Sequence, residues 1–356
     1  MLAGSGVDQG MRLSVLDLVP VRTDQTTGDA LAASTRLAQV ADRSGFERYW
    51  VAEHHNMPSV ASTSPPVVIG HLAAHTQHIR VGSGGVMLPN HAPLAVAEQF
   101  ALLEAAHPGR IDLGIGRAPG SDPVTSMALR GPAGRGDADV AEFPQYLDDV
   151  MALMGPDGVR VAVPRQQYVL KATPAATSVP ALWLLGSSAY SAELAAEKGL
   201  PYVFAHHFSG QGTAQALELY RSRFRPSEHA ERPRTFLTVN AVVADDADEA
   251  AALALPHLHM MVALRTGAPM RPLAVVEDAE EAGVPEQYAG LVDAGLAQAV
   301  VGDPAGAARQ VRELAERFDV DEVMVHPVAS VRRGTDPGTA PGRERTLELL
   351  AKELIG

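Results

Sequence analysis

Three groups of residues could together form a site that holds a cofactor and moves a proton. His54 follows a short apolar run, and its imidazole suits proton transfer because an unperturbed pKa of about 6.5 lies near neutral pH. Ser187–Ser188 opens a helical pattern whose free backbone amides would favour a phosphate, and Arg117, a lone arginine in a glycine-rich segment, could clamp the same anion. Gly84–Gly85 interrupts an apolar run, which indicates either a bulge or a close approach of the backbone to a ligand.

Each of these signals also has a plain structural explanation. Neighbouring strand residues point to opposite faces, so only one of His54 and His55 can face a pocket. Ser187–Ser188 could serve only as a local helix cap. No metal site is expected, because there is no His-Glu-x-x-His helix and no carboxylate accompanies three histidines at helical spacing, which fit a polar outer helix face better: His71, His75 and His78.

The elements that must position these residues alternate regularly between strand and helix. Eight apolar runs predict strands that begin near residues 13, 49, 79, 111, 181, 202, 236 and 322. Helical patterns cover residues 29–44, 65–76, 93–106, 191–198, 211–224, 248–264 and 305–318. Eight such repeats favour an α/β fold, a closed (β/α)₈ TIM barrel with loop insertions. An open doubly wound sheet is the alternative, but the first strand lacks the Gly-x-Gly-x-x-Gly fingerprint of that fold.

A barrel of this kind places the candidate residues together. The carboxyl ends of the strands carry the active sites of TIM barrels, and further polar candidates follow the sixth strand, at His206 and His207. We expect residues 1–10 to form a flexible tail and residues 11–356 to form a single domain. Insertions around residues 117–180 and 266–298 are expected over the loop face, where one would act as a mobile lid.

The amino-acid composition argues against several kinds of partner and site. The chain has 356 residues, 46% hydrophobic and 20% charged, with a net charge of −13 and scattered basic residues, so nucleic acid is not an expected partner. Without Cys there is no disulfide, thiolate metal site or cysteine nucleophile. No apolar run approaches the roughly 18 residues of a membrane span, and no basic segment starts a signal peptide. We expect a cytoplasmic protein that does not enter membranes.

Five segments, in order along the chain, resemble the bacterial luciferase-like flavin monooxygenase family. They are WVAEHH at 50–55, VGSGGVMLP at 81–89, PGRIDLGIGR at 108–117, AAEKGLP at 195–201 and VGDP at 301–304. The resemblance runs from about residue 11 to residue 330. Segments 186–188 and 205–208 are most similar to a broad branch of single-chain relatives, most of them uncharacterised.

The resemblance implies a (β/α)₈ enzyme that binds reduced FMN, reacts it with dioxygen and oxygenates a small organic substrate. The reduced FMN would come from a separate NAD(P)H-flavin reductase. By resemblance, His54 matches the active-site histidine of the family, and Glu53 matches a neighbour that lines the pocket. Gly84–Gly85 lies where the family has a non-prolyl cis peptide under the isoalloxazine ring. Relatives dimerise through helices on one side of the barrel, which implies a homodimer in which the helix at 93–106 could take part.

The implied phosphate contacts are Arg117 and Ser188, with Ser191 as a possible third. Ser187 stands where luciferase has Glu, and Gly116 where it has Cys, so light emission and aldehyde specificity are not implied. Two other hypotheses stay open: hydride transfer with a deazaflavin coenzyme on the same fold, and a non-catalytic flavin-binding relative. The identity of the substrate is not in the sequence.

Overall fold

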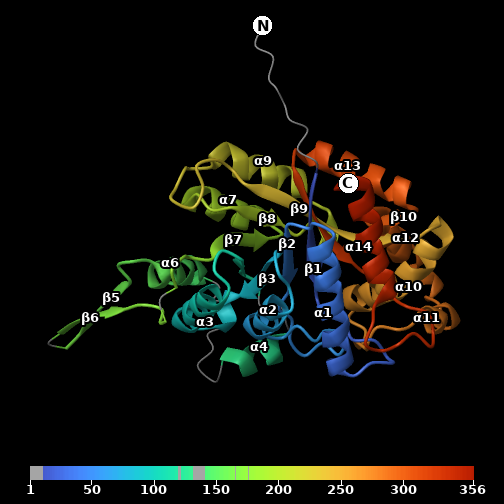
Figure 1. Ribbon diagram of the computed structural model, residues 1–356, viewed down its shortest axis with the longest axis horizontal. Coiled ribbons are helices and arrows are strands. Elements are labelled where there is room, and N and C mark those ends of the chain that lie inside the picture. The colour runs from blue at the N-terminus through green and yellow to red at the C-terminus, as the bar shows by residue number, and fades with distance from the viewer. Residues whose placement is uncertain (1–10, 119–121, 131–140, 165, 175) are drawn as a thin grey trace, which may run out of the picture.

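The computed structural model describes residues 11–118, 122–130, 141–164, 166–174 and 176–356, and the predicted tail at 1–10 lies outside them. Eight parallel strands close into a barrel in the order β11-β1-β2-β3-β4-β7-β8-β9, with β9 pairing back to β11 (Figure 1). The (β/α)₈ barrel predicted from the sequence is confirmed. Its strands are β1 (Arg12–Asp17), β2 (Arg48–Val51), β3 (Arg80–Met87), β4 (Ile111–Gly116), β7 (Ala181–Gly186), β8 (Tyr202–Phe204), β9 (Thr235–Val243) and β11 (Glu322–Pro327).

The strands are apolar on both faces because both faces are buried. Side chains that face the barrel interior form one aromatic and aliphatic layer, which includes Leu16, Trp50, Trp183, Phe236 and Met324. The ring centroids of Trp50 and Trp183 lie 5.3 and 5.0 Å from that of Phe236. The alternate residues pack outward against the helices in the main hydrophobic core. A short extra strand that was not predicted, β10 (Val300–Gly302), pairs with β9 outside the barrel.

A ring of helices covers the barrel. Two of its members were not predicted: one lies at 143–154, inside the predicted insertion, and the other is the last. The last was missed although Pro341 at its first turn and apolar residues at helical spacing, such as Leu347 and Leu350, are typical of a helix. This helix packs between the first and the seventh helix of the ring and so completes it. The ring consists of α1 (Thr27–Arg43), α2 (Pro65–Ala74), α3 (Pro93–Ala106), α6 (Phe143–Met154), α7 (Ala189–Lys198), α9 (Thr213–Arg223), α13 (Pro304–Phe318) and α14 (Pro341–Leu354).

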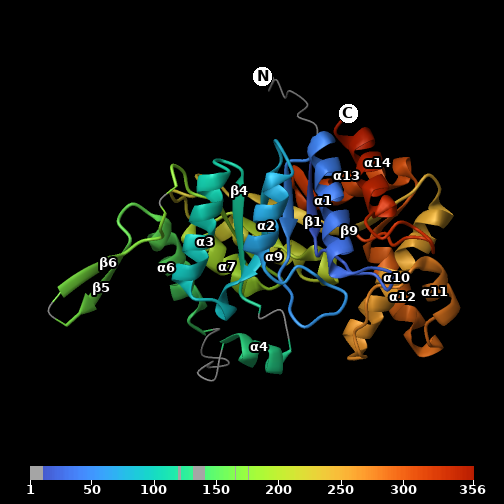
Figure 2. The ribbon, with the colours of Figure 1, turned by 60° about the horizontal axis from the view of Figure 1, so that its bottom comes forward.

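The two predicted insertions contain secondary structure of their own. In the first, the helix α4 (Pro123–Arg130) contacts the short helix η1 (Leu88–Asn90) that follows β3. The hairpin of β5 (Val159–Val163) and β6 (Gln166–Leu170) extends away from the body of the fold in both views instead of covering the strand ends (Figures 1 and 2). This part of the insertion was therefore placed wrongly.

The second insertion packs on the long helix α10 (Ala247–Thr266), which precedes it. It comprises α11 (Val276–Ala282), η2 (Glu286–Tyr288) and α12 (Ala289–Gln298). The backbone around Leu273 pairs with the segment after β1, so this insertion reaches the carboxyl ends of the strands. Within the described ranges, no helix combines the length and the apolar character that crossing a membrane requires. A short helix, α8 (His206–Ser209), follows β8.

Candidate active site

The alternation of β2 decides which of its adjacent histidines faces the barrel. Trp50 and Ala52 belong to the interior layer, and His54 continues that alternation beyond the end of the strand. The rings of His207, on the short helix α8 after β8, and of His326, at the end of β11, lie near enough for their charged forms to interact with that of His54. His54 therefore lies over the interior of the barrel, at the carboxyl ends of the strands.

The imidazole of His54 is enclosed and incompletely bonded. Burial lowers its pKa by more than the neighbouring Glu53 carboxylate raises it, so the ring favours its neutral form. Its Nδ1 atom is buried and has no hydrogen-bond partner in the structure. A neutral imidazole with a free nitrogen is able to take up or pass on a proton.

Glu53, next to His54, joins two of the loops at the mouth of the barrel. Its carboxylate is fully buried and accepts hydrogen bonds from Nε2 of His55 (2.8 Å), Nε2 of His91 (2.8 Å) and the amide of Met87 (3.0 Å). Burial raises the pKa of this carboxyl, but the hydrogen bonds from the histidines and the amide outweigh that effect and lower it. All these bonds tie the loops after β2 and β3 together, which gives Glu53 a positioning role, and its place in the lining of the pocket stays a prediction.

His207 and His326 have fixed ring orientations. The Thr238 hydroxyl donates to the Phe204 carbonyl (3.2 Å), so its oxygen accepts from Nδ1 of His207 (2.8 Å). The Asn240 amide donates to the His207 carbonyl (3.0 Å), so its oxygen accepts from Nδ1 of His326 (2.9 Å). In both rings Nδ1 carries the hydrogen, and Nε2 keeps its lone pair.

A third ring, that of His257 on α10, extends this histidine group. The rings of His207 and His257 each lie 5.9 Å from that of His326. Burial lowers the pKa of His207 to about 3 and that of His257 to about 4, and it holds the pKa of His326 well below its usual value. All three are therefore neutral near pH 7. The other candidate, His206, packs away from the group against Phe318, at 5.2 Å between ring centroids.

Sequence reasoning missed two members of this group. The last barrel strand was predicted to end at Val325, and the structure extends it by two residues, so His326 stands at the rim. A histidine directly after a predicted barrel strand was the signal that could have found it. His257 lies inside a helix whose apolar residues leave no distinct face, so its position carried no such signal.

Gly84–Gly85 lies where β3 departs from regular pairing. The register with β4 shifts between Ser83 and Val86, which confirms the bulge, and the Gly84–Gly85 peptide bond is cis. A Cβ atom on Gly85 would lie 2.8 Å from the carbonyl oxygen of Gly114. Only glycine fits there, because the backbones of the two strands approach so closely.

The candidate phosphate contacts gather at the start of α7. Arg117, just after β4, stacks on the ring of Tyr190, with 4.2 Å between the guanidinium carbon and the ring centroid. Ser187 and Ser188 are exposed, and Ser188 is the N-cap but makes no side-chain capping bond, so its hydroxyl does not satisfy the first amides of the helix. Ser191 is buried, and its hydroxyl donates to the Ser188 carbonyl (3.0 Å), so this hydroxyl is used inside the first turn.

The described part of the chain offers no cluster of metal ligands at this site. Among the residues that the structure describes, no group of three or more His, Asp or Glu side chains is arranged to hold an ion. His71 lies exposed on α2 and His75 at its C-cap, as predicted, whereas His78 lies beyond the end of the helix.

Comparison with known proteins decides the family. A model of the luciferase-like monooxygenase family matches residues 11–321. The chain belongs to this family. It is 42% identical over 314 residues to the uncharacterized protein YvbT of Bacillus subtilis, covering 88% of this chain and 90% of that protein. It is 40% identical over 319 residues to a luciferase-like monooxygenase of Escherichia coli, covering 90% and 92%.

A solved structure shows the same likeness in three dimensions. The apo form of MsnO8 aligns with a TM-score of 0.83 at 34% sequence identity, covering 96% of this chain and 98% of that one. The family and the barrel that the sequence motifs indicated are both confirmed.

Proposed function

We propose that this luciferase-like protein is a flavin-dependent monooxygenase that uses reduced FMN and dioxygen to oxygenate a small organic substrate. The observation that carries the proposal is the Arg117–Tyr190 stack beside the N-terminus of α7, on the same end of the barrel as His54. An anion site and a buried, neutral imidazole therefore lie at the same end of the barrel.

Two relatives support monooxygenase chemistry. An N-acetyl-S-alkylcysteine monooxygenase of Bacillus subtilis is 38% identical over 227 residues, which is 62% of this chain and 65% of that protein. The oxygenase component of a flavin-dependent trigonelline monooxygenase of Acinetobacter baylyi is 34% identical over 108 residues. The second name describes an oxygenase with a separate partner, which supports an NAD(P)H-flavin reductase as the source of reduced FMN.

The residues present fit an FMN molecule. Arg117 and the exposed amides at Ser187–Ser188 would hold the phosphate, since the positive end of a helix and a guanidinium both favour it. The flat ring system would lie at Gly84–Gly85, where a Cβ on Gly84 would contact Leu16 and Trp50 and where the strands leave no room for side chains. When bound, reduced FMN supplies the electrons that activate dioxygen.

His54 is the proposed proton carrier of the reaction. Its Nδ1 is buried and has no partner, and burial lowers the pKa of the ring and so favours its neutral form. The bonds of Glu53 to His55 and His91 would hold the loop that carries His54 in place. His54 would act on the proton, and Glu53 would act as a positioning residue.

The phosphate contact is tested by replacing Arg117. We expect Arg117→Ala to weaken FMN binding by about 2–3 kcal/mol, the scale of a lost charge-assisted hydrogen bond, in a fluorescence titration. Riboflavin has no phosphate, so its affinity should hardly change. Equal losses for the two flavins would mean that Arg117 is structural.

A deazaflavin-dependent hydride transfer is the second candidate. It is supported by the fold alone: a solved coenzyme F420 dependent tetrahydromethanopterin reductase aligns with a TM-score of 0.65 at 18% identity. Titration of the purified protein with reduced FMN, oxidised FMN and the deazaflavin separates the two candidates. Preferential binding of the deazaflavin would replace the monooxygenase proposal, and binding of flavin without any oxygen chemistry would favour a non-catalytic relative.

We also propose that the protein is a homodimer. The neighbouring helices α2 and α3 pack together and carry Val67 and Leu102, which are 71% and 56% exposed. An apolar face of this kind is typical of a subunit interface. Light scattering at micromolar concentration should give the mass of two chains, and Leu102→Asp should shift it towards one. A monomeric wild-type protein would remove the proposal.

A further inference from the structure

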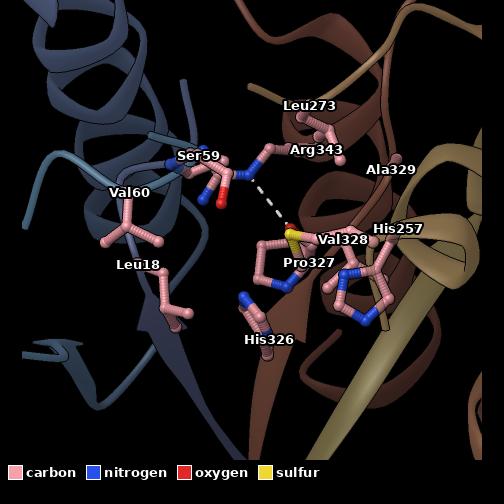
Figure 3. Close-up of a pocket in the computed structure, with 12 residues that line it drawn as sticks. Leu18, Ser59, Val60, His257, Leu273, His326, Pro327, Val328, Ala329 and Arg343 are labelled. Atoms are coloured by element: carbon pink, nitrogen blue, oxygen red, sulfur yellow. Dashed lines mark hydrogen bonds between the residues drawn. The ribbon is translucent and has the colours of Figure 1, made fainter. Parts of the chain in front are cut away.

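A wide groove lies at the amino-terminal end of the barrel, opposite to the candidate active site. It is lined by the end of α6, the first residues of β7 and the loop before β9. Its walls enclose about 1400 Å³, part of it open to solvent. By contrast, the cavity beside His257 and His326 in Figure 3 has room for only about one or two waters. Of these two spaces, the groove is the one that can receive an organic molecule.

One buried polar atom of the residues that line the groove has no partner. Trp183, which is 2% exposed, has no acceptor for its Nε1–H in the structure. Leaving such an atom unpaired is costly, so most buried polar atoms in proteins are bonded. An indole N–H can only donate, so a ligand that satisfies it must carry a hydrogen-bond acceptor.

A cation lies against the same ring. The guanidinium carbon of Arg234 is 5.3 Å from the centroid of the Trp183 ring. Among the described residues, no carboxylate lies within ion-pair distance of Arg234, although Asp157 and Glu228 also line the groove. A third carboxylate of the lining, that of Asp148, is already bound by a lysine of α7. A guanidinium has donors only, so Arg234 needs an acceptor just as the indole does.

Much of the remaining wall is apolar. Met151 comes from α6, while Val179, Pro180 and Leu182 come from the start of β7, and Val179 is 57% exposed. An apolar group placed against these side chains would leave water, which favours binding. The groove therefore fits a ligand that joins an anionic acceptor to an apolar body.

We propose that this groove binds a small carboxylate with an apolar body, such as 3-phenylpropionate, at a site separate from the reaction. Its carboxylate would accept hydrogen bonds from Arg234 and from Nε1 of Trp183, and its ring would lie against Met151 and Val179. An amine cannot satisfy two groups that only donate. The inference does not depend on the FMN chemistry proposed above.

Three probes of similar length test the charge of the ligand: 3-phenylpropionate, 3-phenylpropionamide and 3-phenylpropylamine. Isothermal titration calorimetry on the full chain, without flavin, should show the carboxylate binding at least about tenfold more tightly than the other two. Amide or amine binding as tightly as the carboxylate would overturn the proposal. No binding of the carboxylate would also overturn it, and would leave water as the partner of Trp183.

Substitutions of three arginines locate the bound carboxylate. Arg234→Met should weaken 3-phenylpropionate binding at least about tenfold. Arg232→Met is the matched control, because this exposed arginine belongs to the same loop but does not line the groove, and it should leave binding unchanged. Equal weakening in both variants would indicate a general attraction to positive charge and overturn the site. Loss of binding in Arg117→Ala instead would place the carboxylate at the opposite end of the barrel.

Filling the groove tests whether the apolar body lies in it. Ala152, an exposed lining residue of α6, accepts a larger side chain without disturbing the core, so Ala152→Phe should weaken binding at least about tenfold. Gln145→Phe adds the same ring on an exposed residue of the same helix outside the groove, and should change nothing. Unchanged binding in Ala152→Phe would overturn the proposal.

Tryptophan fluorescence tests the contact with the indole. The chain has two tryptophans, Trp50 and Trp183, whose ring centroids lie 5.7 Å apart inside the barrel. Because an anion that bonds to an indole N–H alters its emission, 3-phenylpropionate should change the emission with the midpoint that calorimetry gives. Arg234→Met should need at least about tenfold more ligand for the same change. Calorimetric binding without any change in emission would place the carboxylate away from Trp183 and overturn the assigned contact.

Discussion

At the amino-terminal end of the barrel, Arg48 is enclosed by Glu322, at 2.7 and 3.1 Å, and by Asp112, at 2.8 Å, while Trp50 donates to the same Asp112 at 2.9 Å. At the carboxyl-terminal end, the charged groups Glu53 and Asp17 are likewise fully bonded, but the buried rings of His54 and His257 are uncharged, and one nitrogen of each has no partner. Both ends enclose polar groups within one barrel, about one strand length apart.

This difference between the two ends indicates that one contributes mainly to stability and the other to the reaction. Charges such as those at Arg48 are tolerated in a barrel interior only when each is matched, and removing one partner leaves the others buried and uncompensated. Neutral rings with unbonded nitrogens can be buried without a counter-ion, and these nitrogens are available to bind a ligand or a proton. The amino-terminal end is therefore expected to govern folding, and the carboxyl-terminal end to govern reaction.

The largest expected effect is on catalysis, at His54. His54→Ala should leave FMN affinity nearly unchanged and slow the reaction of bound reduced FMN with dioxygen by about 10²–10⁴-fold, the usual range for general acid–base catalysis. Stopped-flow absorbance measures this rate. Added imidazole should restore part of it, because the vacated space matches that ring.

The adjacent histidine is the matched control. His55 bonds to Glu53, so His55→Ala should mainly reduce stability, with a much smaller effect on the rate. The opposite pattern, full rate in His54→Ala and none in a folded His55→Ala, would show that the assignment is off by one residue. If neither substitution matters, His207 is the next candidate.

The next largest effect is on folding, at Arg48. Arg48→Met should lower the free energy of unfolding by about 3–5 kcal/mol in urea denaturation, because Glu322 loses its two closest charged hydrogen bonds inside the barrel and Asp112 keeps only its pair with Arg80. FMN affinity of the folded fraction should be unchanged. Arg223→Met breaks an exposed pair with Glu193 and should cost less than about 1 kcal/mol. Similar losses in both variants would remove the contrast between the two ends.

Local patterns in the sequence were enough to predict the barrel. Parallel strands buried on both faces are continuous apolar runs, so all eight could be located, and the helix at 93–106 agrees with α3 because Pro93 begins it and Pro108 follows it. The helix α14 was missed although Leu347 and Leu350 have helical spacing, since a long polar segment precedes it.

The site could be predicted only as a list of residues at one rim. Glu53 accepts a hydrogen bond from His91, which is 38 residues away in the sequence. The tautomer of His326 is set by its hydrogen bond to Asn240, which is 86 residues away. Such pairings are set by the closure of the barrel, and no local spacing encodes them. For the same reason the choice between His206 and His207 needed the structure, in which only His207 faces the mouth.

The smallest expected effect is a pH dependence of stability that comes from the carboxyl-terminal end. Burial lowers the pKa of His207 to about 3 in the folded protein, whereas an unfolded histidine titrates near 6.5. Between these values the unfolded chain binds the extra proton, so the free energy of unfolding should fall as the pH drops below about 6.5, by up to about 1.4 kcal/mol per pH unit for this residue. Above pH 7 both states are neutral and the contribution is constant. The free energy of unfolding of His207→Gln, measured by urea denaturation, should therefore fall less between pH 7 and pH 5 than that of the wild type. The difference between the two pH slopes should correspond to the uptake of about one proton. An unchanged slope would mean that His207 is hydrated in the folded state, and the carboxyl-terminal end would then be less buried than the amino-terminal end.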